Sequence, residues 1–157
     1  MKIDNYIQKL NLKLDKIIKR FNAEQKQIFA QIPVNITKLA ISFGLNVYEF
    51  DNNKIESYVF NDNIGVNFEL SYLEKRFAIA RELSCYLLNK QLKQKNINHI
   101  TYIKKDKNIG KEILDYSARY ILVPKKQLAK ISLNEVAKEA KRFEISSKNL
   151  LKRIKNS

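Results

Sequence analysis

The sequence predicts an α+β protein in which a small sheet of about three strands packs against a helical core. Three observations predict this class. Apolar residues have helical spacing over residues 3 to 30, they alternate with polar residues over residues 45 to 70, and long helical segments follow residue 71. With 157 residues, the chain can bury one substantial core and is too short for two ordinary domains. We therefore expect one unit that carries an N-terminal helix and a C-terminal helical pair.

Residues 1 to 32 are predicted to form an N-terminal amphipathic helix, or two helices that break near Asn22. The apolar residues recur mostly at intervals of three and four, at Ile3, Ile7, Leu10, Leu14, Ile17, Ile18, Phe21, Ile28 and Phe29. A stripe of this kind must be covered by the rest of the domain, by a second copy or by a partner. We expect the domain itself to cover it.

The next segment is predicted to contain one short helix and three strands. Pro33 and Asn35 mark a turn, and the helix that begins at Ile36 ends at Gly44, a typical helix C-terminus. Runs rich in β-branched and aromatic residues follow at residues 47 to 50, 58 to 60 and 64 to 68. Turns rich in Asp and Asn separate these runs, so the sequence predicts three short strands.

Two longer helices are predicted after the strands. The first begins near Ser71, because Ser71 and Glu74 have the spacing of a capping box. The second covers residues 111 to 123, and Pro124 ends it. Between the helices, residues 91 to 110 are polar and predict a loop, with a strand around residues 99 to 103.

Residues 131 to 157 are predicted to form a basic C-terminal helical pair, over residues 132 to 142 and 146 to 156. Ser132 lies three residues before a glutamate, the spacing of a capping box, and Ser146 is a suitable N-cap for the second helix. Two helices at this spacing are typical of a helix-turn-helix, and also of a hairpin that closes the core. We favour the hairpin.

The first long helix contains the frame of a zinc-binding H-E-x-x-H motif, with Arg81 and Cys85 at the two histidine positions. In an active zinc peptidase, the two histidines bind the metal and the glutamate takes a proton from the metal-bound water. Only that glutamate, Glu82, is present here. Because the Arg81 guanidinium has no lone pair and is permanently cationic, the motif argues against hydrolysis.

The order of segments carries a wider resemblance. The segments are residues 36 to 47, 63 to 68, 76 to 88, 119 to 124 and 136 to 154. In this order they resemble the ImmA/IrrE family of metallopeptidases, in which a short helix and a small sheet precede the zinc helix. The resemblance covers about residues 33 to 155 and implies a zincin-like core, degenerate in its zinc motif, over residues 33 to 130.

The same resemblance implies a third zinc ligand, an acid early in the second core helix. Glu112 and Asp115 are the nearest acids. We expect Arg81 to replace the metal electrostatically, by pairing with one of these acids or with Glu82. The alternative for Glu82 is an ordinary solvated carboxylate on a helix surface.

Cys85 offers a different route to a metal. A thiolate is a good zinc ligand, and an acid together with His99, the only histidine, could complete an unusual site. A zinc peptidase with such non-standard ligands is one alternative function. We favour a buried, inert thiol, and we expect neither zinc nor another cofactor.

The net charge of +14 is concentrated near the C-terminus, where residues 101 to 157 hold fifteen basic and six acidic side chains. Such a region attracts phosphate backbones or acidic partners. Nucleic-acid binding is therefore an alternative function, and the candidate residues on the last helix are Lys148, Lys152, Arg153 and Lys155. The abundance of Lys, Asn and Ile throughout the chain also fits a bias toward AT-rich codons.

Together, the resemblance and the missing ligands predict a catalytically degenerate ImmA/IrrE-like protein that acts as a binding or regulatory factor. Active members of the family are associated with phages, integrative elements and stress responses, where they cleave helix-turn-helix repressors. The resemblance therefore implies a transcriptional regulator as the protein partner, and a link to a phage or mobile element. No run is long enough to cross a membrane, and the first residues lack the apolar core of a signal peptide, so we expect a cytoplasmic protein without a membrane partner.

Overall fold

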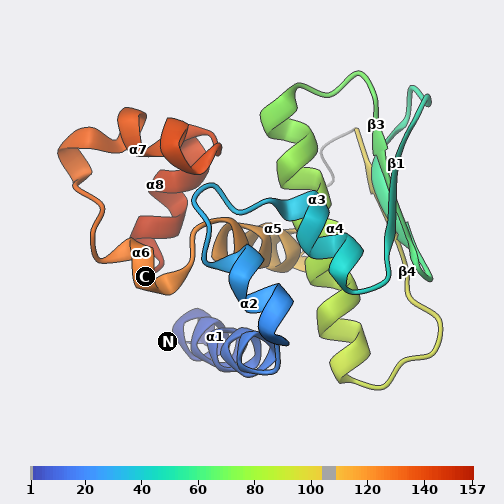
Figure 1. Cartoon of the computed structure of the whole chain (residues 1–157), viewed down its shortest axis with the longest axis horizontal. Coiled ribbons are helices and arrows are strands. Elements are labelled where there is room, and N and C mark those ends of the chain that lie inside the picture. The colour runs from blue at the N-terminus through green and yellow to red at the C-terminus, as the bar shows by residue number, and fades with distance from the viewer. Residues whose placement is uncertain (1, 104–108) are drawn as a thin grey trace.

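A four-stranded sheet lies at one end of the computed structural model, which describes residues 2–103 and 109–157 (Figure 1). The strands are β1 (Asn46–Phe50), β2 (Ile55–Phe60), β3 (Asn63–Asn67) and β4 (Asn98–Tyr102), in the order β1-β3-β2-β4. β1 is parallel to β3, whereas β2 is antiparallel to both β3 and β4. The predicted α+β class is confirmed.

The sheet has one strand more than the three that the sequence predicted. The additional strand, β4, pairs with β2, so that Ile100 lies opposite Tyr58 and His99 opposite Val59. Its apolar Ile100 is exposed, while the polar Thr101 is buried. The strand expected around residues 99 to 103 therefore joins the sheet with its polar side inward, the reverse of the usual amphipathic pattern. The rest of the loop expected there includes residues 104 to 108, which lie outside the described residues.

Helix α4 (Tyr72–Gln91) is the central element, because it packs against β2 and β3 on one side and against other helices on the other (Figure 1). The predicted capping box is present: the Ser71 hydroxyl accepts from the Glu74 backbone N–H, and the Glu74 carboxylate accepts from that of Ser71. Helix α4 is buried over most of its circumference, as a helix between two layers must be.

The N-terminal segment forms two helices, α1 (Lys2–Lys19) and α2 (Ala23–Phe29), which break at Asn22 as one of the two sequence alternatives predicted. Asn22 caps α2 by accepting a hydrogen bond from the backbone of Gln25. Leu10 and Leu14 of α1 pack against Tyr116 and Tyr120 of the later helix α5 (Ile109–Leu122). The domain thus covers the apolar stripe, as expected.

Helices α3 (Ile36–Ser42) and α5 (Ile109–Leu122) complete the packing around α4, and the short α6 (Lys125–Leu128) follows α5. Gly44 follows α3 with a φ of 82°, the left-handed conformation that ends helices and favours glycine. Pro124 lies just beyond the end of α5 and precedes α6, as predicted. Both boundaries follow from local backbone chemistry.

The C-terminal pair consists of α7 (Val136–Phe143) and α8 (Ser147–Lys155), preceded by the short 3₁₀ helix η1 (Leu133–Glu135). The expected capping box at Ser132 is absent, because the chain makes a 3₁₀ turn there and the Ser132 side chain caps nothing. Ser146 does cap α8, by accepting from the Asn149 N–H at 3.2 Å. Phe143 and Leu150 are fully buried in the main core. The pair therefore closes the core, as the hairpin alternative predicted.

The described residues contain no helix that combines the length and the apolarity needed to cross a membrane.

Candidate functional site

The guanidinium of Arg81 lies buried among three carboxylates, and only 2% of the residue is exposed. Its Nη2 lies 2.9 Å from Glu56 Oε1, its Nη1 3.3 Å from Asp115 Oδ1, and its Nε 3.7 Å from Glu82 Oε1. The carboxylates come from β2, α5 and α4, so Arg81 joins the sheet to both core helices. The expected pairing of Arg81 with Asp115 and Glu82 is thus present, and Glu56 is an additional partner.

A β-bulge in β2 explains how Glu56 reaches Arg81. The pairing of β2 with β4 shifts register between Ile55 and Ser57, so that Glu56 is an extra residue in its strand. Ser57, the next residue, also faces α4: its hydroxyl accepts from Arg81 Nη2 at 2.9 Å. Two successive side chains can approach the same helix only because the bulge interrupts the alternation of faces.

Glu82 is completely buried and accepts hydrogen bonds from the sheet. Ser57 Oγ donates to its Oε1 at 2.6 Å, and Thr101 Oγ1 donates to the same oxygen at 3.0 Å. Its other oxygen, Oε2, lies 2.8 Å from His99 Nδ1, so that a carboxylate there favours the tautomer with a proton on Nδ1. The alternative of a solvated helical carboxylate is therefore wrong, and Glu82 has no open approach for a water molecule.

The charges around Arg81 hold its guanidinium in the protonated state. Burial works to lower the pKa of Arg81, but the negative charges of Glu56 and Glu82 outweigh burial and raise that pKa above its ordinary value. Because Nε makes no hydrogen bond, its contact with Glu82 is electrostatic only. One central cation thus faces three carboxylates, and hydrogen bonds from its Nη atoms and from the sheet complete the cluster.

Cys85 is buried one helical turn after Arg81, and its Sγ accepts from Asn89 Nδ2 at 3.3 Å. Burial, together with the nearby charge of Glu82, raises the pKa of the Cys85 thiol to about 12. The thiol is therefore neutral at physiological pH, whereas zinc binds the thiolate. A buried, inert thiol was the favoured expectation, and the burial of Cys85 agrees with it.

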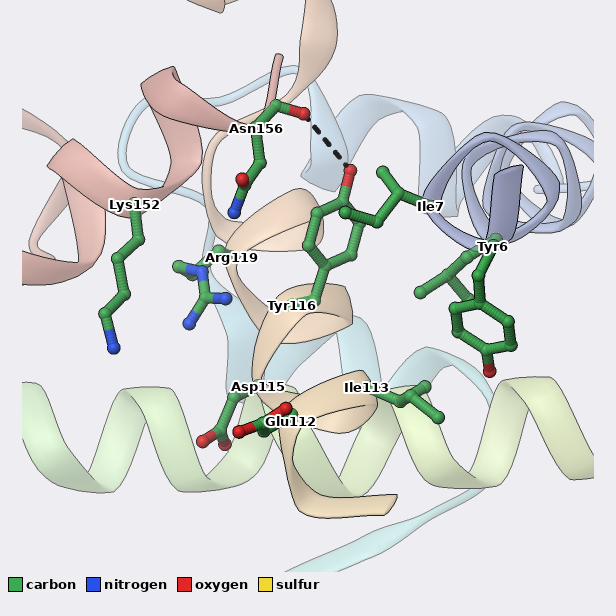
Figure 2. Close-up of a pocket in the computed structure, with 10 residues that line it drawn as sticks. Tyr6, Ile7, Glu112, Ile113, Asp115, Tyr116, Arg119, Lys152 and Asn156 are labelled. Atoms are coloured by element: carbon green, nitrogen blue, oxygen red, sulfur yellow. Dashed lines mark hydrogen bonds between the residues drawn. The ribbon is translucent and has the colours of Figure 1, made fainter. Parts of the chain in front are cut away.

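The structure separates the other candidates for a metal site. His99, which the alternative site required beside Cys85, makes its hydrogen bond to Glu82 instead. Glu112 is exposed on α5 and lines a pocket between α1, α5 and α8 (Figure 2). Within residues 2–103 and 109–157, no three His, Cys, Asp or Glu side chains are grouped so that they could hold a metal ion.

The basic residues predicted on α8 divide into two groups. Lys148, Lys152 and Lys155 are exposed, whereas Arg153 is only 2% exposed. Arg153 Nε donates to the backbone oxygen of Val123 at 3.1 Å, and its guanidinium lies 4.4 Å from the ring centroid of Tyr120. The expectation that Arg153 meets phosphate is thus corrected, because this residue lies on the face of α8 that packs against the core.

The sequence interpretation missed Glu56, Ser57 and Thr101 as members of the cluster, and considered His99 as a metal ligand. The signal for β4 was present in residues 99 to 102, where polar residues alternate with apolar ones. Only the buried Glu82 shows which of those two faces points inward.

The sequence matches no protein family model, and no curated protein matches it. The resemblance to the ImmA/IrrE family therefore stays a prediction from the order of segments in the sequence.

Proposed function

We propose that this chain is a catalytically degenerate ImmA/IrrE-like protein that acts as a binding or regulatory factor. One observation supports this function above the others: the Arg81 guanidinium lies between Glu82 and Asp115. In the family that the chain resembles, the first histidine of the motif, the glutamate and the acid of the second helix would surround zinc at this place. An arginine there supplies a fixed positive charge in place of the metal ion.

The residues at the zinc-ligand and general-base positions of the motif do not suit peptide hydrolysis. A guanidinium cannot bind zinc and would repel the ion. Glu82 is hydrogen-bonded to Ser57 and Thr101, so it is not available to take a proton from water. Cys85 is buried, and burial raises the pKa of its thiol. The same cluster instead holds the sheet against α4 and α5.

The edge of the sheet offers a place for a partner. β4 is an edge strand, and its inward residues His99 and Thr101 contact Glu82 beside the Arg81 cluster. An unpaired edge can take an extended segment of another protein as an additional strand. The partner class that the resemblance implies is a helix-turn-helix repressor linked to a phage or mobile element, bound here without being cut.

Binding without cleavage is tested with purified helix-turn-helix repressors from the source genome. Each repressor is immobilised for biolayer interferometry with the chain, and each mixture is then incubated with zinc and examined by intact-mass spectrometry. We expect at least one repressor to bind and every repressor mass to stay unchanged. A repressor that is cut by the chain but not by its Glu82→Gln variant would contradict the proposal, as would the absence of binding to every repressor.

A second candidate function, nucleic-acid binding, is favoured by one specific observation. Lys148, Lys152 and Lys155 are spaced at i, i+4 and i+7 on α8, so the three exposed lysines share one face of the helix. Helix α8 lies at the end of the molecule opposite the sheet (Figure 1). Such a stripe can contact successive phosphates of a duplex.

This second function predicts a measurable dependence on salt. The affinity for a 20-base-pair duplex, followed by fluorescence anisotropy at several salt concentrations, should fall steeply as salt rises. The variant Lys148→Gln/Lys155→Gln should bind more weakly and reduce the slope of log K against log[salt] by about two. The control Lys54→Gln/Lys95→Gln removes two exposed lysines near the sheet and should change the slope little. Equal effects of the two variants would rule out a specific role for α8.

A further inference from the structure

A pocket of about 680 Å³ opens between α1, α5 and α8, away from the Glu82 hydrogen bonds (Figure 2). Its volume lies in the range of small-molecule sites, about 300–1,000 Å³. The pocket has a polar side and an apolar side. Charged residues from α5 and α8 line the first, and residues of α1 with Ile113 line the second. This division predicts an amphipathic small molecule as the ligand.

Arg119 is the strongest indication of a ligand. Only 8% of this residue is exposed, and its Nε is buried without a hydrogen-bond partner. In the described part of the chain, Arg119 makes no hydrogen bond or ion pair, and burial lowers its pKa. The nearby charge of Asp115 opposes this effect of burial only in part, and Asp115 already pairs with Arg81. Removing the Arg119 cation from water is therefore poorly compensated within the described part of the chain. A carboxylate in the pocket would supply the missing acceptor for Arg119.

The charges opposite Arg119 restrict the ligand further. Lys152 lies on the same side as Arg119, and the carboxyl groups of Glu112 and Asp115 face them (Figure 2). Asp115 already pairs with Arg81, whereas the exposed Glu112 has no ion pair within the described residues. A simple anion would meet the negative charge of Glu112, and a simple cation would meet Arg119. A ligand that carries both charges close together satisfies both groups.

The apolar side of the pocket predicts that the rest of the ligand is apolar. Tyr6, Ile7 and Leu10 of α1 lie across the pocket from Ile113 of α5, and the ring of Tyr116 borders the same space. Figure 2 shows Ile7, Tyr6 and Ile113 on the side of the pocket away from Lys152. This surface suits a large aliphatic or aromatic group.

We propose that this pocket binds a free α-amino acid with a large apolar side chain. Arg119, assisted by Lys152, holds the carboxylate, and Glu112 holds the ammonium group. The side chain of the ligand packs between α1 and Ile113. Because α1, α5 and α8 each contribute to the pocket, the bound amino acid joins the N-terminal and C-terminal helices. This inference goes beyond the proposed binding function and does not depend on it.

The test is a calorimetric titration of the full chain with L-phenylalanine. N-acetyl-L-phenylalanine lacks the ammonium group and represents the C-terminus of a peptide, and L-phenylalaninamide lacks the carboxylate and represents an N-terminus. We expect L-phenylalanine to bind and each derivative to bind at least about tenfold more weakly, because each leaves one charged group unpaired. Equal binding of either derivative would overturn the proposal. So would the absence of L-phenylalanine binding at about 20 mM, a concentration far above the Kd of a specific site.

Variants assign the roles of the residues. Arg119→Gln and Glu112→Gln should each weaken L-phenylalanine binding at least about tenfold. The control Lys155→Gln removes an exposed charge from α8 outside the pocket and should leave the affinity unchanged. Arg119→Gln should keep the melting temperature of the ligand-free protein, since it removes an unpaired buried charge. Wild-type affinity in either pocket variant overturns the proposal, and the exposed Glu112→Gln decides the matter if Arg119→Gln does not fold.

Discussion

Replacing Arg81 with methionine is expected to lower the free energy of unfolding by about 3–5 kcal/mol, the range found when one partner of a buried ion pair is removed. Methionine keeps most of the volume of the side chain but removes the only cation of the cluster. Glu82 would then be fully buried without an opposite charge, although its bonds from Ser57 and Thr101 would remain. Glu56 and Asp115 would lose their common partner as well.

The measurement is equilibrium unfolding in urea, followed by circular dichroism. The control Lys141→Met removes an exposed charge from α7 and should change the free energy of unfolding by less than about 0.5 kcal/mol. A double-mutant cycle with Asp115→Asn measures how much of the lost free energy of unfolding comes from the interaction between Arg81 and Asp115. A loss in Arg81→Met as small as that in the control would show that the cluster does not hold α4 to the sheet.

Local chemistry made several features of the fold predictable from the sequence. The capping box at Ser71 and the glycine after α3 depend on a few adjacent residues, and both are present in the structure. Ser132 shows the limit of this reasoning. The spacing of a capping box was present, but the chain makes a 3₁₀ turn there before α7 begins. Spacing alone does not show which local conformation the surrounding packing selects.

The place of the fourth strand in the sheet and the Glu56 contact could not be predicted for a different reason, because both depend on contacts between distant residues. β4 pairs with β2 across about forty residues of sequence, and its inward face is polar. Such a face looks like a solvated surface until the buried Glu82 provides its hydrogen-bond acceptor. The bulge at Glu56 likewise has no signal in the sequence, since it arises from the pairing itself.

The pairing of Arg81 with a nearby acid, by contrast, was predicted from the motif, although the prediction left Glu82, Glu112 and Asp115 open. The motif placed a cation where a metal ion would lie, and electrostatics then required an acid nearby. Of the two acids considered on α5, only the structure distinguishes Asp115, which pairs with Arg81, from Glu112, which does not, although both line the pocket. One helical turn of α5 thus contributes to both candidate sites.

Restoring the two histidines should convert the cluster into a zinc site. In the variant Arg81→His/Cys85→His, both imidazoles would lie on one face of α4, one turn apart, with Asp115 of α5 opposite. In the natural chain, the Arg81 guanidinium supplies the positive charge that Glu56, Glu82 and Asp115 face, and in the variant a zinc ion would supply it. We expect about one zinc per chain after dialysis, and a melting temperature that rises with zinc because the ion binds only the folded state.

The zinc content is measured by plasma mass spectrometry, and the melting temperature by differential scanning fluorimetry. The matched control Lys9→His/Lys13→His places two histidines at the same spacing on two exposed positions of α1. Asp115→Asn in the two-histidine variant should weaken zinc binding strongly, since a coordinating carboxylate is lost. Zinc uptake no greater than that of the surface control would contradict the zincin-like geometry. Zinc uptake without peptidase activity is the expected result, because the hydrogen bonds from the sheet still occupy Glu82.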